Sequence, residues 1–260
     1  MSNLIKIANQ ENFVTVVTLN RPATANALSV KLLKEFNHAL ETVTTDPTVR
    51  CIIITGTGNK VFCAGADLKE RMEMDEVQVR RTVELIRNTM DTVQNLPVPV
   101  IAAINGAAFG GGLELALACD IRLASTTAKM GLTETSLGII PGAGGTQRLP
   151  RIVGVSFAKE LIFTARKIDA EEALKLGILN KITEADQLMN KALELAAEIS
   201  RNAPLSLKAA KKAINEGIDM EIARGLEIEK RWYDTIIESK DRLEGLQAFK
   251  EKRRPLFTGK

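Results

Sequence analysis

The chain has 260 residues, of which 45% are hydrophobic and 26% are charged, and its mean hydropathy is close to zero. This composition fits one large globular domain, or one domain with an appendage. The net charge of +3 argues against a dedicated nucleic-acid-binding protein, and the single histidine, His38, makes a histidine-dependent nucleophile or a zinc site a poor expectation.

The cysteines and the N-terminal segment bear on where the protein works. Cys51, Cys63 and Cys119 are scattered, odd in number and without a CxxC pair, which fits a reducing compartment. The N-terminus resembles neither a signal peptide nor a transit segment, so we expect a cytoplasmic protein. The longest apolar region, residues 98–118, contains a proline, an asparagine, four glycines and Glu114, and is therefore a poor candidate for a membrane span.

Taken in chain order, the first half alternates strand-like and helical segments. Runs rich in β-branched residues predict strands at residues 4–8, 13–19, 50–55, 100–104 and 121–124. Apolar periodicity predicts helices at residues 30–43 and 68–96, and a short apolar helix follows the glycines at 106–112. His38 falls on the polar side of the first helix, so we expect it to be solvated. Buried strands that alternate with helices predict an α/β fold with helices on the sheet faces.

After about residue 142 the pattern becomes helical. Helices are predicted at residues 155–165, 170–176, 185–201, 205–216, 221–238 and 241–253. No low-complexity linker separates the two parts, so we expect an α/β core and a helical C-terminal part that pack together.

Three consecutive glycines, Gly110 to Gly112, open the predicted short apolar helix in the stretch NGAAFGGGLELALACD at residues 105–120. The chain has no P-loop, and residues 142–147 fail the dinucleotide-binding fingerprint because a glutamine replaces its third glycine. Two interpretations stay open. The glycines could permit close strand–helix packing, or they could let a substrate reach the free N–H groups and positive dipole of a helix N-terminus. In the second case an oxyanion would be stabilised there.

Two glutamates lie in apolar surroundings and are candidates for acid/base chemistry. Glu114 would fall in the first turn of the apolar helix, where a carboxylate can also serve simply as a partner for the helix dipole. Glu134 follows twenty residues later in another apolar, glycine-rich segment. Burial raises the pKa of a carboxyl group, so one of the two could hold a proton near neutrality. The spacing alone does not show that they meet.

Several segments together resemble the enoyl-CoA hydratase (crotonase) superfamily over nearly the whole chain. They are NRP at 20–22 with NAL at 26–28, FCAGADLKE at 62–70, INGAAFGGGLELALACDI at 104–121, GLTETSLGIIPGAGGTQRLPR at 131–151 and GLQAFKEKR at 245–253. The resemblance implies a crotonase-like fold, in which a spiral of ββα units forms two packed sheets surrounded by helices. It also implies an α/β core at residues 1–200 and a helical trimerisation region at residues 201–260.

The resemblance implies catalytic roles for four positions. The backbone N–H groups of Ala66 and Gly111 would form an oxyanion hole for the thioester carbonyl. Glu114 and Glu134 would hold a water near C3 of a 2-enoyl-CoA, with Glu114 mainly as base and Glu134 as the acid that supplies the C2 proton. Gly142 would help to position that water through its N–H group. The presence of both glutamates favours hydratase chemistry, because isomerases, decarboxylases and hydrolases of the superfamily commonly lack one.

The resemblance also implies how the substrate, an acyl-CoA thioester, binds. Neither a metal nor a separate cofactor is implied, because coenzyme A is part of the substrate. The position of Ala23 is often lysine in hydratases, so a phosphate contact is missing or replaced here. Phe249 and Lys252 match residues that touch the adenosine end, often across a subunit boundary of the homotrimers or dimers of trimers that the family forms. The implied substrate-binding positions are Ala23, Ala25, Ala64, Asp67, Leu68, Lys69, Pro141, Gly142, Phe249 and Lys252.

Within the family, the strings CAGADLKER, AKMGLTET and DRLEGLQAFKEKR look like the 3-methylglutaconyl-CoA hydratase branch. That branch handles a branched, acidic acyl chain, but no clear cation for a distal carboxylate can be assigned from the sequence. We therefore expect a short-chain enoyl-CoA hydratase, with 3-methylglutaconyl-CoA as a candidate substrate and a crotonase-fold isomerase or hydrolase as the alternative. An RNA-binding role through Lys208, Lys211 and Lys212 belongs to another class, and a solvated basic face is the simpler interpretation of that cluster.

Overall fold

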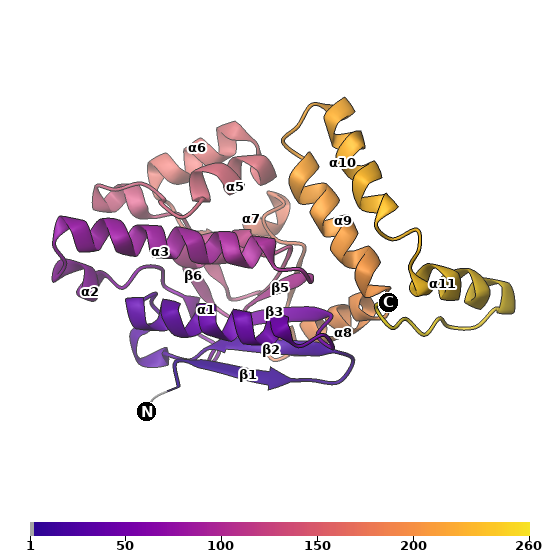
Figure 1. Ribbon diagram of the computed structural model, residues 1–260. Coiled ribbons are helices and arrows are strands. Elements are labelled where there is room, and N and C mark those ends of the chain that lie inside the picture. Colours follow the sequence, from indigo (N-terminus) through magenta and orange to yellow (C-terminus); the bar gives the residue numbers. More distant parts are fainter. Residues whose placement is uncertain (1–2) are drawn as a thin grey trace.

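The computed structural model describes residues 3–260, and within them the strands form two sheets of six and four strands (Figure 1). The larger sheet consists, in spatial order, of β1 (Ile5–Asn9), β2 (Val14–Leu19), β3 (Cys51–Gly56), β5 (Val100–Ile104), β7 (Ile121–Ser125) and β10 (Lys181–Thr183). The smaller sheet consists of β4 (Val61–Cys63), β6 (Ala107–Phe109), β8 (Lys129–Gly131) and β9 (Ile168–Asp169). In the larger sheet β1 is antiparallel to β2, and the other neighbouring strands are parallel. The predicted α/β class is confirmed.

The central strands of the larger sheet are buried on both sides because helices cover both faces of the sheet. On one face, Ile52 and Ile54 of β3 join a core with α1 (Val30–Thr45), α3 (Glu76–Asn95) and α4 (Gly111–Ala118). On the other face, Ile53 and Ile101 pack with residues of α8 (Leu188–Ser200). The alternation of neighbouring residues between two cores is the period of two that a strand imposes.

The predicted helix at residues 68–96 is wrong as a single helix. Two helices occur there, α2 (Leu68–Met72) and α3, and a capping box starts the second. The side chain of Asp75 accepts from the N–H of Gln78 at 2.8 Å, and the side chain of Gln78 accepts from the N–H of Asp75 at 2.9 Å. These reciprocal bonds satisfy amides that a continuous helix would have paired with the preceding turn. The break lets α2 turn away from α3 next to the glycine-containing loop at residues 62–67.

The sequence patterns missed the shortest elements. Strands β4, β6, β8, β9 and β10 have only two or three residues each, too few for an alternating pattern to be recognised. The helix α5 (Gly145–Val153) begins at glycines and contains Pro150, so it does not follow ordinary helix propensities. The remaining segments of the second half are α6 (Val155–Thr164) and α7 (Ala170–Lys175), with short 3₁₀ helices η1 (Pro22–Thr24) and η2 (Glu134–Leu137) elsewhere. None of the helices in the described range is long and apolar enough to cross a membrane.

The C-terminal helices α9 (Pro204–Gly217), α10 (Ile222–Asp234) and α11 (Lys240–Glu251) extend away from the sheets on one side (Figure 1). The helix α9 is tied to the core near its middle, where the Nζ atom of Lys211 donates to Asp120 at 2.7 Å and to the carbonyl of Val98 at 3.0 Å. The division of the chain near residue 200, and a role of this arm in trimerisation, stay predictions.

Candidate active site

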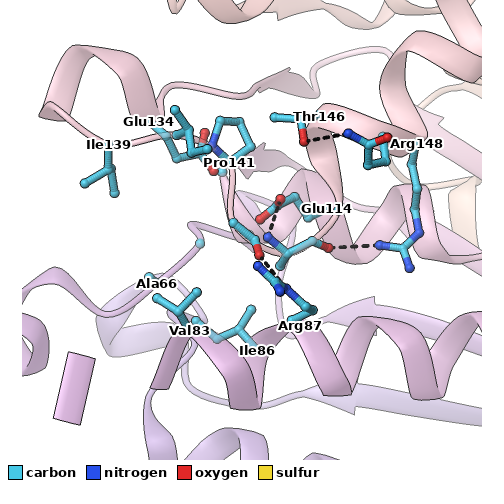
Figure 2. Close-up of a pocket in the computed structure, with 18 of the residues that line it drawn as sticks. Ala66, Val83, Ile86, Arg87, Glu114, Glu134, Ile139, Pro141, Thr146 and Arg148 are labelled. Carbon is cyan, nitrogen blue, oxygen red and sulfur yellow. Dashed lines mark hydrogen bonds between the residues drawn. The ribbon is translucent and has the colours of Figure 1, made fainter. Parts of the chain in front are cut away.

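A cavity of about 1200 Å³ lies between α3, the N-terminus of α4, and the segment from η2 to α5 (Figure 2). Its lining brings together segments that are far apart in the sequence. Ala66 comes from the loop before α2, Gly111 and Glu114 come from α4, and Glu134 comes from η2. All four residues with predicted catalytic roles thus line one cavity, although their roles stay predictions.

Two backbone amides in this cavity are free to bind a ligand. The neighbours of Ala66 pair with Leu28: the Leu28 N–H donates to Gly65 at 2.8 Å, and the Asp67 N–H donates to Leu28 at 3.3 Å. This short parallel bridge leaves the N–H of Ala66 on the opposite side. Gly111 is the first residue of α4, so its N–H has no acceptor in the preceding turn. Within residues 3–260, neither amide donates to a backbone carbonyl.

The two amides face the same space. A Cβ atom added to Gly111 would lie 3.7 Å from the amide nitrogen of Ala66. Gly65 has φ +91°, and a Cβ atom there would lie 2.7 Å from the carbonyl oxygen of Phe109 and 3.1 Å from the nitrogen of Gly111. Only glycine allows the loop to approach the helix start this closely. The closeness of the two unpaired amides is compatible with the predicted oxyanion hole, which stays a prediction.

Asp67 fixes the loop that carries the Ala66 amide. Its Oδ1 atom accepts from the N–H groups of Lys69 and Glu70 at 3.1 and 3.2 Å, which caps α2, and its Oδ2 atom accepts from Arg21 at 2.5 Å. Burial alone would raise the pKa of Asp67, but Arg21 and the two amides outweigh it and hold the pKa below its ordinary value. Asp67 was predicted to bind substrate, but its carboxylate accepts hydrogen bonds from donors of the chain itself.

Glu114 is 3% exposed and is held by the loop that precedes α5. Its Oε1 atom accepts from the N–H groups of Ala143 and Gly145, each at 2.8 Å. A Cβ atom on Gly145 would lie 3.0 Å from that oxygen, so glycine permits the short contact. Burial raises the pKa of Glu114, while the two amides and the positive charges of Arg148 and Arg87 oppose the rise. The amides thus favour the ionised form of this carboxyl.

Glu134 lies in a different electrostatic setting. It is 9% exposed, and its Oε2 atom is buried without a hydrogen-bond partner in the described chain. Burial, with a further contribution from the charge of Glu114, raises the pKa of Glu134 to about 7. Its Oε1 atom lies 3.1 Å from where a Cβ atom of Gly110 would stand, which puts the carboxyl beside the start of α4. Of the two acids, Glu134 is therefore the better proton donor near neutral pH.

The predicted substrate-binding positions divide into two groups. Ala64, Leu68, Pro141 and Gly142 line the cavity. The others are outside its lining: Ala23, Ala25, Asp67, Lys69, Phe249 and Lys252. The last two lie at the end of α11, exposed and far from α3 within the same chain (Figure 1). A single chain therefore does not bring them to the acyl site, and the predicted contact across a subunit boundary stays a prediction.

The residues that sequence reasoning missed are basic. Arg71, Arg87, Arg148 and Arg151 all line the cavity, although no cation had been assigned to it. The sequence could have indicated Arg87, because helical spacing places it on one helix face with the apolar residues Val79, Val83 and Ile86. Arg148 supports the site's loop, because its guanidinium donates to the carbonyl of Ala143 at 2.9 Å.

Groups suited to nucleophilic catalysis lie elsewhere. His38 is exposed on α1, as predicted. The three thiols are buried, and burial raises the pKa of Cys51, Cys63 and Cys119 to about 12, so they stay protonated near neutrality. None of these four residues lines the cavity, so they offer no alternative to the predicted catalytic residues there.

Comparison with known proteins identifies the class to which this fold and cavity belong. A family profile described as enoyl-CoA hydratase/isomerase matches residues 9–260, and the chain belongs to that family. The crystal structure of an enoyl-CoA hydratase from Bacillus anthracis superposes with a TM-score of 0.97 at 51% identity, covering 99% of this chain and 100% of the other. The predicted crotonase-like fold is thereby confirmed.

Two curated relatives carry more specific names. The mitochondrial methylglutaconyl-CoA hydratase of Mus musculus is 51% identical over 250 residues, covering 95% of this chain and 80% of that protein. The enoyl-CoA isomerase/hydratase fer4 of Mycosarcoma maydis is 46% identical over 253 residues, covering 94% of this chain and 92% of that protein. The predicted resemblance to the methylglutaconyl-CoA hydratase branch is confirmed by such relatives.

Proposed function

We propose that this protein is an enoyl-CoA hydratase, which adds water across the C2=C3 double bond of a short-chain 2-enoyl-CoA to give a 3-hydroxyacyl-CoA. The observation that carries the proposal is the meeting of two free amides, those of Ala66 and Gly111, with the buried carboxyl groups of Glu114 and Glu134 at one cavity. The amides can stabilise the negative charge on the thioester oxygen, and the carboxyl groups can transfer the protons.

The thioester carbonyl would bind between the two amides. When oxygen adds at C3, negative charge builds up on the thioester oxygen as an enolate forms. The amides of Ala66 and Gly111 are fixed by the bridge to Leu28 and by the helix start, so they need no reorganisation to meet this charge. A single donor of this kind is typically worth about 3–4 kcal/mol of transition-state stabilisation.

The two glutamates would handle the water. Glu114 would remove a proton from a water, assisted in its placement by the N–H of Gly142, and the water oxygen would form the new bond to C3. Glu134 would give its proton to C2, so the electron pair of the double bond ends in a new C2–H bond. Glu114 then holds the proton taken from the water and Glu134 is ionised, and proton exchange with solvent restores both. The pKa of Glu134, raised to about 7, suits the acid role.

Coenzyme A would enter past Ala64 and Leu68, which line the cavity next to the Ala66 amide. No additional cofactor is needed for this reaction. We further propose that the chain acts as a homotrimer or a dimer of trimers, in which Phe249 and Lys252 of α11 reach the adenosine end of a ligand bound by a neighbouring chain. Their exposure at the end of the arm is compatible with that arrangement.

Methylglutaconyl-CoA is the candidate substrate that the named relatives favour, and an isomerase is the alternative activity. A panel of thioesters tests both. Crotonyl-CoA and 3-methylglutaconyl-CoA should lose their conjugated-enone absorbance and yield 3-hydroxyacyl products, ranked by kcat/KM. A 3-enoyl-CoA that gains this absorbance, without any hydration of crotonyl-CoA, would replace the hydratase proposal by the isomerase.

A further inference from the structure

The four arginines that line the cavity differ in how far their donors are already used. The guanidinium of Arg148 donates to Gln94, Ala143 and Asp91, and its side chain is only 15% exposed. Arg151 is paired with Asp219 at 2.8 Å and also donates to the Gln147 carbonyl. These two charges are balanced by acids of the chain itself, so neither is free for a ligand.

Arg87 is placed differently. Its Nε atom donates to the carbonyl of Gly142 at 3.2 Å, and its two terminal nitrogens have no acceptor among residues 3–260. It rises from α3 toward the loop that carries Pro141, on the same helix face as Val83 and Ile86 (Figure 2). The bond to Gly142 places the guanidinium beside the loop whose next amides hold Glu114. Four N–H donors of this exposed side chain therefore remain available in the lining of the cavity that holds the two glutamates.

Arg71 is the other arginine with unused donors, and its Nε atom is buried without a partner in the described chain. It lies on α2, three residues after Leu68 and on the same helix face. That position is next to Leu68, where the proposed entry of coenzyme A lies. The charge of Arg87, in contrast to that of Arg71, is among those that oppose the rise of the Glu114 pKa, which agrees with a place near Glu114.

We infer that Arg87 selects an acyl group with a carboxylate at C5, by binding it through its free terminal nitrogens. This inference rests on the proposed function, because it assumes that a thioester occupies the cavity with C3 near Glu114. A carboxylate two bonds beyond C3 would enter the field of two glutamates and be repelled without a nearby cation. A guanidinium with a free pair of N–H groups matches a carboxylate in both charge and shape. The deeper wall, with Val83 and Ile86, then contacts the aliphatic carbons.

Binding of saturated thioesters tests the inference without requiring turnover. Glutaryl-CoA and valeryl-CoA have chains of the same length and differ at C5, which is a carboxylate in the first and a methyl group in the second. Titration calorimetry should give glutaryl-CoA a Kd about tenfold lower or better, because a hydrogen bond to a charged group is worth about 1.5–3 kcal/mol. Arg87→Met should abolish this preference, and Arg87→Lys should keep part of it.

Arg81→Met is the matched control, since Arg81 lies exposed on the same helix and outside the cavity lining. It should keep the full preference for glutaryl-CoA. Equal Kd values for the two thioesters in the unmodified protein would overturn the inference, and so would a preference that survives Arg87→Met or is lost only in Arg71→Met. Hydration of crotonyl-CoA, measured separately, keeps the two proposals apart: its absence refutes the hydratase, while the ratio of Kd values judges Arg87. If neither thioester binds, the inference about Arg87 falls, while hydration of crotonyl-CoA still judges the hydratase.

Discussion

Replacing Glu134 by glutamine should slow the reaction and stabilise the fold at the same time. The carboxyl is 9% exposed and its Oε2 atom has no hydrogen-bond partner in the described chain, so its ionised form is poorly solvated. Glutamine has nearly the same shape but never ionises. We expect turnover to fall by about 10²–10⁴-fold, the usual contribution of a general acid.

The size and sign of the stability effect follow from the pKa of Glu134. This pKa is raised from an ordinary 4.5 to about 7, and each pKa unit corresponds to about 1.4 kcal/mol. Below pH 4.5 the carboxyl is protonated in both the folded and the unfolded chain and has no effect. As the pH rises, the unfolded chain loses its proton first, so the free energy of unfolding decreases until about pH 7. The full decrease in the free energy of unfolding is about 3 kcal/mol. Glu134→Gln should not show this decrease, because glutamine does not ionise.

The assay is urea unfolding of both proteins at about pH 4.5 and about pH 8, at one protein concentration because oligomers unfold in a concentration-dependent way. From the lower to the higher pH, the free energy of unfolding of the variant should rise relative to that of the original protein by up to about 3 kcal/mol. Glu84→Gln is the control, since Glu84 is exposed on α3 and should give no such difference. If Glu134→Gln and the original protein show the same pH dependence, Glu134 titrates like an ordinary carboxyl and the assignment of the acid is wrong.

Three further substitutions address other parts of the site. Gly111→Pro removes one amide of the oxyanion hole and should lower kcat by about 10²–10³-fold, whereas Gly111→Ala keeps the N–H and should lose less; equal losses would show that the amide is not the cause. Gly145→Ala would bring a Cβ atom to 3.0 Å from the Glu114 oxygen and should reduce kcat more than thioester binding, as steady-state kinetics would reveal. Asp67→Asn weakens the pair with Arg21 and the cap of α2, and should cost about 1–3 kcal/mol of unfolding free energy near neutrality. This cost should shrink as the pH falls below the ordinary Asp pKa of 3.8, because the unfolded chain then takes up a proton while folded Asp67 stays ionised down to its lowered pKa. A constant cost would refute the role of its charge.

The sequence by itself determined most of the architecture, because the signals of long strands and helices are local. Five strands were predicted close to their bounds, and the start of α4 at Gly111 was expected from the glycines and the apolar run after them. Family motifs also pointed to Ala66, Gly111, Glu114 and Glu134, which the fold does bring to one cavity. The Asp75–Gln78 capping box could have indicated the break between α2 and α3. Apolar periodicity continued across the break, however, so a single helix was predicted.

Only the tertiary structure decided how the two acids differ and which arginines line the cavity with them. The amides of Ala143 and Gly145 lie about thirty residues from Glu114 in the chain, yet their bonds to its Oε1 atom are what distinguish it from Glu134. The same holds for Arg87, whose charge matters through its place next to Gly142 and not through its neighbours in sequence. A pKa or a charge balance depends on distances between groups and on the solvent between them. Those quantities do not exist until segments that are remote in the chain have packed together.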